Sequence, residues 1–310
     1  MKKISIVTPT YNEEKNIEIL CDLISNEMKK VSYDYEHIVI DNASKDKTIE
    51  ILKRISSEDK KLKVIINNKN FGHIRSPMHG LFQASGDAII LMMSDLQDPI
   101  ELIGQYISEW ENGHEIVMAQ KNTSDENKFF HKIKEKLYKL INKLSDQKLL
   151  INTTGSGLYS KRIIDILRSL KDPYPYFRGI VSEISEEIKL IKYHQPKRKH
   201  GETKNNFYTL YDIGILGVVK HSKIALRIIT FLGFFMSFFS IIVAIVFFVL
   251  KIIFWDAFAL GIAPLMIGLF TLGSIQILIL GLIGEYVMYI LTHSRNMPLV
   301  VEKERINFED

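Results

Sequence analysis

The chain has 310 residues, 25% of them charged and 46% hydrophobic, and a formal net charge of +4 at pH 7. This length fits one catalytic-sized domain with an appendage and is too short for three domains. The single cysteine, Cys21, excludes an internal disulfide, and the lack of a basic stripe interleaved with stacking aromatic residues argues against a nucleic-acid partner.

Short β-branched runs alternate with helical patterns over the first hundred residues. The predicted strands are Lys3–Thr8, Glu36–Asp41, Leu62–Asn67 and Asp87–Met93. The predicted helices are 13–30, 47–56, His73–Ala84 and Ile100–Glu111. This alternation predicts a Rossmann-like α/β domain built on a mainly parallel sheet.

Polar residues follow three of the predicted strands, where ligands bind in such sheets. After the second strand, Asp41 can accept hydrogen bonds from a base or a ribose hydroxyl, and Ser44 and Asp46 lie beside it in the sequence. The three residues together are a candidate nucleotide-binding turn. Ser44 and Asp46 are equally suited to cap the helix that follows, and that alternative stays open.

The turn after the first strand is expected at the same edge of the sheet. Pro9 and Tyr11 are candidates for a wall against the nucleobase. Glu13 belongs to the same segment, although an acid in the first turn of a helix also suits the helix dipole without any function.

Asp95 and Gln97 follow the fourth strand and are the candidate metal ligands. If the segment is extended, residues two apart point the same way, and a carboxylate with an amide carbonyl suits Mg²⁺ or Mn²⁺. The ion would need a diphosphate, such as that of a nucleotide-sugar, to complete its shell. A turn anchored by Asp98 and Pro99 is the structural alternative.

A basic loop covers residues 195–204. Arg198 can bind a phosphate through two hydrogen bonds, and Lys204 can add a point charge. The alternative is juxtamembrane charge that attracts anionic lipid. His73 and Arg75 are weaker candidates for orienting the site, since a glycine turn before a helix is expected there in any case.

No charged residue interrupts 228–250 or 257–284, and each stretch exceeds the roughly 20 residues that cross a bilayer. Flanking basic residues then predict a multi-pass protein of the inner (plasma) membrane with the catalytic domain and both termini cytoplasmic. The resulting division is a catalytic domain (1–206), a juxtamembrane amphipathic segment (207–227), a two-helix transmembrane hairpin (228–291) and a tail (292–310). Residues 128–148 form an amphipathic pattern that suits either the membrane surface or packing on the sheet.

The order of these motifs resembles the polyprenyl-phosphate glycosyltransferases of glycosyltransferase family 2, which include enzymes similar to dolichyl-phosphate mannose synthase and bacterial undecaprenyl-phosphate glucosyltransferases. The resemblance extends over nearly the whole chain. It rests on Thr8–Glu14, Asp41–Asp46, Asn70–His73, Ser94–Pro99, Gly201–Lys204 and the pair of apolar stretches near the end.

The resemblance implies a GT-A fold and a set of site residues. It places Pro9, Tyr11, Glu13 and Asp41 against the nucleotide, with Asp95 and Gln97 on the metal. It further places Arg198 and Lys204 near the phosphates, and Lys121 where many relatives carry an arginine for the lipid phosphate. Two departures stand out: Met93 occupies a usual metal-ligand position, and Asn42 replaces an acid of the nucleotide turn.

The predicted function is transfer of a sugar from a nucleotide-sugar, with a UDP-sugar favoured, to undecaprenyl or another polyprenyl phosphate with inversion and with Mg²⁺ or Mn²⁺. The other expected partners are membrane lipid, further copies of the chain and a flippase acting downstream. Two alternatives remain: a processive polysaccharide synthase, and a membrane-tethered scaffold that binds nucleotide-sugars without turnover.

Overall fold

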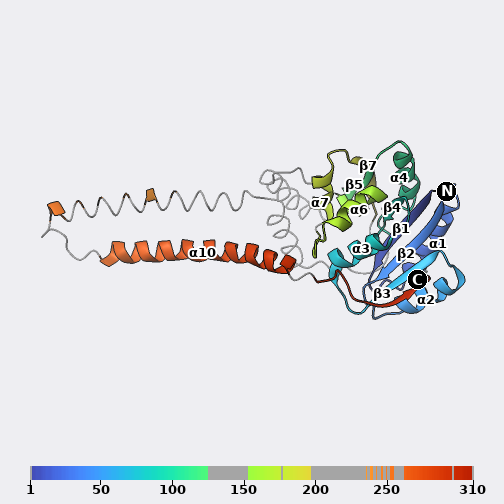
Figure 1. Ribbon diagram of the computed structural model, residues 1–310, viewed down its shortest axis with the longest axis horizontal. Coiled ribbons are helices and arrows are strands. Elements are labelled where there is room, and N and C mark those ends of the chain that lie inside the picture. The colour runs from blue at the N-terminus through green and yellow to red at the C-terminus, as the bar shows by residue number, and fades with distance from the viewer. Residues whose placement is uncertain are drawn as a thin grey trace.

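The structure, a computed structural model, describes residues 2–124, 153–175, 177–196, 262–294 and 297–308, with a few positions between 235 and 254. The described strands form one eight-stranded sheet in the order β7-β5-β6-β4-β1-β2-β3-β8 (Figure 1). The strands are β1 (Lys3–Thr10), β2 (Asp34–Asp41), β3 (Leu62–Asn67), β4 (Ala88–Leu91), β5 (Ile116–Ser124), β6 (Thr153–Ser160), β7 (Lys189–Gln195) and β8 (Glu302–Ile306). The helices are α1 (Ile17–Met28), α2 (Thr48–Glu58), α3 (Gly72–Gln83), α4 (Leu102–Glu111), α6 (Lys161–Ser169), α7 (Phe177–Ile184) and α10 (Ile262–Ser294).

The eight elements predicted up to residue 111 are all confirmed, with ends that differ by a few residues. β1 pairs in parallel with both β2 and β4, and β2 pairs in parallel with β3. Their carboxyl ends therefore lie at one edge of the sheet, as the sequence predicted. Runs of apolar residues explain this part of the sheet, because parallel strands covered on both faces bury nearly every side chain.

The sheet is mixed, because β6 runs antiparallel to β4 and β5, and β8 runs antiparallel to β3. β7, the outermost strand on the side away from β8, pairs in parallel with β5. The carboxyl ends of β5 and β7 consequently point the same way as those of β1, β2 and β4.

Helices cover both faces of the sheet. On one face, α1 and α4 pack over β1, β4 and β5, while α1 and α2 pack over β2 and β3. On the other face, α3, α6 and α7 form a second apolar layer. The resulting α/β/α sandwich holds its three hydrophobic clusters between the layers, which leaves the strand ends free of core packing and open to polar chemistry.

The strand β8 was not predicted from the sequence, where residues 292–310 were assigned to a tail. It pairs with β3, from Val64 opposite Ile306 to Asn67 opposite Glu302. Beyond the strand, Asn307 donates hydrogen bonds to the carbonyl oxygens of Ser56 (2.7 Å) and Leu62 (2.8 Å). The end of the chain thus covers the β3 edge of the sheet, which would otherwise expose unpaired backbone groups.

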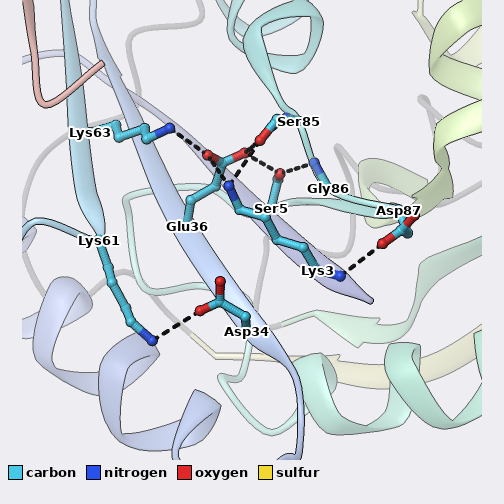
Figure 2. A network of polar contacts seen from close by, with 9 residues as sticks. All are labelled: Lys3, Ser5, Asp34, Glu36, Lys61, Lys63, Ser85, Gly86 and Asp87. Atoms are coloured by element: carbon cyan, nitrogen blue, oxygen red, sulfur yellow. Dashed lines mark hydrogen bonds and ion pairs between the residues drawn. The ribbon is translucent and has the colours of Figure 1, made fainter. Parts of the chain in front are cut away.

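A buried carboxylate joins the strands at the edge opposite to the polar turns (Figure 2). Glu36 binds Lys3 (2.9 Å), Lys63 (2.8 Å) and the hydroxyl of Ser5 (2.6 Å). It also accepts hydrogen bonds from the backbone N–H and the hydroxyl of Ser85. Burial alone raises the pKa of Glu36, but these contacts outweigh it and lower the pKa to about 2. The cluster ties β1, β2, β3 and the loop before β4 together.

The predicted placement in a membrane is contradicted. Among the described residues, no helix combines the length and the apolar character that crossing a bilayer requires. The prediction of a multi-pass protein of the inner (plasma) membrane is therefore wrong, and the two transmembrane helices are not confirmed. The prediction rested on the absence of charge in 228–250 and 257–284 and on the basic residues that flank them.

The helix α10 overlaps the second of these stretches, and Figure 1 shows it extending away from the sheet and its covering helices. Most of the first stretch lies outside the described residues, as do the segments 128–148 and 207–227, for which the sequence also made predictions.

Candidate functional site

The turns after β1, β2 and β4 share an unusual backbone. Asn12, Ala43 and Leu96 have φ angles of 54°, 63° and 55°, which is the left-handed region that residues other than glycine rarely adopt. For Leu96, a bulky residue, this conformation costs on the order of 1 kcal/mol or more. Backbone strain of this kind persists where surrounding contacts hold it, and it gathers at functional sites. The strained positions therefore support a site at this edge of the sheet.

The turn after β2 is built around Asp41, which is fully buried. Its carboxylate accepts hydrogen bonds from the backbone N–H of Ser44 (2.8 Å) and from the Ser44 hydroxyl. That hydroxyl accepts one in turn from the backbone N–H of Asn12 (2.8 Å). Burial raises the pKa of Asp41, and the bonds from Ser44 oppose this shift. Asp41 and Ser44 thus join the turns of β1 and β2 into one hydrogen-bonded network.

Asp46 serves the start of α2. Its Oδ1 accepts hydrogen bonds from the backbone N–H (3.0 Å) and the hydroxyl (2.6 Å) of Thr48, the first residue of the helix. The Thr48 hydroxyl also accepts a bond from the backbone N–H of Glu13 (2.9 Å). These contacts hold the start of α2, although the N-cap position itself is Lys47, whose side chain makes no capping bond. Pro9, Tyr11 and Glu13 are partly exposed beside this network, in the segment where the sequence placed them.

The side chain of Asn42, for which the resemblance led us to expect an acid, makes all its hydrogen bonds within the protein. Its Nδ2 donates to Asn70 Oδ1 (2.9 Å) and to the carbonyl of Gly72 (3.2 Å). Its Oδ1 accepts from the backbone N–H of Phe71 (2.8 Å) and from Asn67 Nδ2 (3.2 Å). An amide offers two donors and two lone pairs, so every position is filled. The Asn42 side chain therefore anchors the loop between β3 and α3, and its amide has no hydrogen-bonding capacity left for a nucleotide.

Replacing Asn42 with aspartate is expected to destabilise the fold by about 2 kcal/mol. A carboxylate cannot donate, so Asn70 Oδ1 and the Gly72 carbonyl would each lose a hydrogen bond and face another acceptor in a buried place. Urea unfolding followed by circular dichroism measures the change. Asn26→Asp, an exposed change of the same kind, serves as the control. Equal unfolding free energies for the two variants would contradict this account.

The turn after β4 holds Asp95 and Gln97. The sequence prediction assumed an extended segment here. The segment instead bends at Leu96. The backbone N–H of Gln97 donates to Asp95 Oδ1 (3.2 Å), which closes the turn. The Gln97 amide Nε2 donates to the carbonyl oxygen of Pro196 (3.3 Å), directly after β7. The turn is thus held by one hydrogen bond within it and by another to the residue after β7.

Asp98, which the sequence assigned only to a turn, forms a second link to β7. Its carboxylate accepts a hydrogen bond of 2.6 Å from the Tyr193 hydroxyl. Burial raises the pKa of Asp98, and the neighbouring Asp95 carboxylate raises it further, while Lys121 acts in the opposite direction. Tyr193 lies opposite Lys121 in the β5–β7 register. The structure therefore brings Lys121 close to the Asp95–Asp98 turn.

The ligand set for a metal is small. Among the residues that the structure describes, no group of three or more His, Cys, Asp or Glu side chains is placed to hold an ion. Asp95 and Gln97 offer one carboxylate and one amide, whose oxygens are the hard ligands that Mg²⁺ or Mn²⁺ prefers. Met93, between them and the strand, packs against the apolar layer of α3, α6 and α7. The side chains fit an ion that takes most of its remaining ligands from a bound diphosphate.

The other candidates are placed less fully. Arg198 and Lys204 lie outside the described residues. His73 is exposed, and the guanidinium of Arg75 donates to the carbonyl of Pro298, so Arg75 helps to hold the segment before β8. Tyr193 was missed, because a tyrosine in a short edge strand gives no signal until the strand is placed against β5.

Three comparisons with known proteins bear on this site. The family profile described as "Glycosyl transferase family 2" matches residues 5–167. An uncharacterized glycosyltransferase of Bacillus subtilis (strain 168), YkcC, is 31% identical over 99% of this chain and 95% of its own length. A protein of Escherichia coli (strain K12), named "Prophage bactoprenol glucosyl transferase homolog", is 31% identical over 97% of this chain and 98% of its own.

Among solved structures, glucosyl-3-phosphoglycerate synthase from Mycobacterium tuberculosis, in complex with Mn²⁺, UDP-glucose and phosphoglyceric acid, superposes with a TM-score of 0.51. The identity is 20%, over 70% of this chain and 78% of that chain, so the likeness concerns the fold. The comparisons confirm a GT-A-like α/β fold and an enzyme of the glycosyltransferase class. With the family profile matched over more than half of its length and full-length relatives at 31% identity, the chain belongs to glycosyl transferase family 2.

Proposed function

We propose that the protein transfers a sugar from a nucleotide-sugar, most simply a UDP-sugar, to a polyprenyl phosphate such as undecaprenyl phosphate. The observation that carries the proposal is that the Asp41–Ser44 turn and the Asp95–Gln97 turn lie at the same edge of the sheet, on either side of β1. The acceptor is inferred from full-length relatives named for bactoprenol glucosyl transfer, such as those of Shigella phage SfV and Escherichia coli.

The nucleotide is proposed to lie across the ends of β1 and β2. Asp41 and Ser44 offer a carboxylate and a hydroxyl to its base and ribose, and Pro9, Tyr11 and Glu13 line the same side. The buried setting of Asp41 strengthens any hydrogen bond that it accepts, because water competes poorly there. Asn42 takes no part, since its amide is filled by contacts within the protein.

The diphosphate is proposed to lie at the turn after β4, which adjoins β1. Asp95 and Gln97 would hold Mg²⁺ or Mn²⁺ there, together with oxygens of the diphosphate, and the ion when bound neutralises charge that develops on the leaving group. Arg198 and Lys204 are proposed to contact the phosphates, and Lys121 with Arg198 to contact the phosphate of the lipid.

The reaction proposed is a direct displacement with inversion. An oxygen of the acceptor phosphate forms a bond to the anomeric carbon while the bond from that carbon to the diphosphate breaks, and the nucleoside diphosphate leaves with the electron pair. A phosphate monoester has a second pKa near 6, so the acceptor is mostly a dianion at neutral pH and needs no strong general base. The protein's task is then positioning and charge stabilisation.

A transfer assay tests the proposal. Purified full-length protein is mixed with undecaprenyl phosphate in detergent and with a panel of radiolabelled UDP- and GDP-sugars, with and without Mn²⁺ or Mg²⁺. A chloroform-extractable monosaccharide product that depends on acceptor and metal is expected, and the panel identifies the donor. A polymeric product would favour a processive synthase, and donor binding without product would favour a scaffold.

A further inference from the structure

We propose that Tyr193 is a positioning residue that holds the metal-binding turn, residues 95–98, in the geometry that receives the donor diphosphate. The proposal rests on the proposed function, because the turn has this task only if a nucleotide-sugar binds there. Tyr193 itself touches neither substrate nor ion in this account. It acts through Asp98, and nothing in the sequence motifs pointed to it.

The contact is short, charge-assisted and removed from water. The Tyr193 hydroxyl donates to Asp98 Oδ1 over 2.6 Å, and the exposed fraction of each residue is 7%. The other carboxylate oxygen of Asp98, Oδ2, is buried without a hydrogen-bond partner among the described residues. The hydroxyls of Tyr193 and, to a lesser degree, Ser156 therefore stabilise a carboxylate that burial makes costly, and only the Tyr193 bond reaches β7.

The turn needs such support because its own backbone is strained. Leu96 has a φ of 55° between the two candidate ligands, and the turn is closed by a contact of 3.2 Å from the Gln97 N–H to Asp95. Two further links reach β7 and the residue after it, through Tyr193 to Asp98 and through Gln97 Nε2 to Pro196. Contacts with residues nearly a hundred positions away thus help to hold the conformation in which Asp95 and Gln97 are presented.

A purely structural role, in which the contact serves to keep β7 on the sheet, is less consistent with the pairing. β7 is already paired with β5 on both sides of Tyr193, from Val117 opposite Lys189 to Ser124 opposite Gln195, with one register shift between Lys121 and Thr123. Loss of the hydroxyl would leave this ladder in place. It would instead deprive a buried carboxylate of a short hydrogen bond, and Asp98 would relieve that cost by shifting the turn toward water.

The test compares wild-type protein with Tyr193→Phe by calorimetric titration of UDP, and separately of GDP, with and without Mn²⁺. The quantity of interest is the gain in nucleotide affinity that Mn²⁺ provides. We expect this gain to fall about tenfold in Tyr193→Phe, while affinity without the ion changes little because the Asp41–Ser44 turn is untouched. Tyr35→Phe is the matched control: it removes the hydroxyl of a tyrosine that is 9% exposed, bonded to Ser25 over 3.3 Å and placed at the start of β2.

Each result decides the matter. An unchanged Mn²⁺ gain in Tyr193→Phe would overturn the proposal, and so would a parallel loss of affinity with and without the ion, which indicates a general structural defect. Absence of any Mn²⁺ gain in the wild-type protein would remove the task assigned to the turn and overturn it too. Because the titration needs no acceptor, a wild-type protein that shows the gain but makes no lipid product would count against the proposed function and leave this inference standing.

Discussion

Replacing Asp95 with asparagine is expected to lower the rate of sugar transfer by at least about 100-fold, the size of effect seen when one group that stabilises developing charge is removed. The residue supplies the only carboxylate among the two candidate metal ligands, and it also closes its own turn by accepting the backbone N–H of Gln97. Asparagine keeps the shape and a carbonyl oxygen but removes the negative charge. The initial rate of transfer to undecaprenyl phosphate at saturating donor measures the effect.

The control for this prediction is Asp165→Asn, which makes the same chemical change in α6. Asp165 pairs with Arg168 over 2.6 Å, and both side chains are about half exposed, so its loss is expected to alter neither rate nor melting temperature appreciably. Asp95→Asn should likewise melt close to the wild-type protein, since Asp95 is partly exposed. Activity within a few fold of wild type at every Mn²⁺ concentration tested, including limiting ones, would rule out Asp95 as a metal ligand.

Replacing Glu36 with glutamine is expected to destabilise the fold by about 3 kcal/mol, the largest effect on stability that we predict. The buried carboxylate receives contacts from two lysines and two serines (Figure 2), and glutamine leaves the ends of Lys3 and Lys63 without their anionic partner. The lysine side chains are 30% and 20% exposed, so water recovers part of the loss. Urea unfolding at pH 7 measures the difference.

The effect depends on pH in a defined direction. The pKa of Glu36 is lowered from 4.5 to about 2 in the folded protein, so the folded state binds fewer protons than the unfolded state between these values. Its stabilisation is therefore fully present above about pH 4.5 and disappears as the pH falls toward 2. The gap between wild type and Glu36→Gln should close over this window.

The effect of Glu36 in acid has to be measured as a difference between wild type and Glu36→Gln, because His37 also titrates. Burial lowers the pKa of this residue to about 3, so the wild-type protein also loses stability in acid for a reason unrelated to Glu36. The difference between wild type and variant isolates the carboxylate. Glu18→Gln, which breaks an exposed pair with Arg54, is the control and should change little at any pH. A Glu36→Gln protein as stable as this control at pH 7 would show that the cluster adds nothing.

Much of the candidate site could be predicted because its residues follow strands that are local in sequence. The runs that form β1, β2 and β4 are apolar and β-branched, and the ends of parallel strands meet at one edge, so the order of residues was enough to predict Asp41 and Asp95 at the same edge. The capping role of Asp46 remained open, since the same residue types serve helix starts and ligands.

Other parts of the site depended on pairings between distant segments. Tyr193 meets Asp98 across 95 positions, and Asn42 fills its amide from residues 25 to 30 positions away. The edge strand β8, Glu302–Ile306, is short and mostly charged, and only the exposed edge of β3 makes it a strand. None of these contacts leaves a periodic pattern in the sequence.

Local patterns along the chain were sufficient to predict the alternation of strands and helices up to residue 111, the edge at which the polar turns gather, and the family. Each of these depends on short-range hydrophobic spacing or on motifs taken in order. Folding settled how the turns are held, which polar side chains are already satisfied, how the sheet ends, and that no described helix meets the requirements for a membrane span. The difference arises because a buried polar group is satisfied by whichever atoms folding brings within about 3 Å, and these come from segments far apart in the chain.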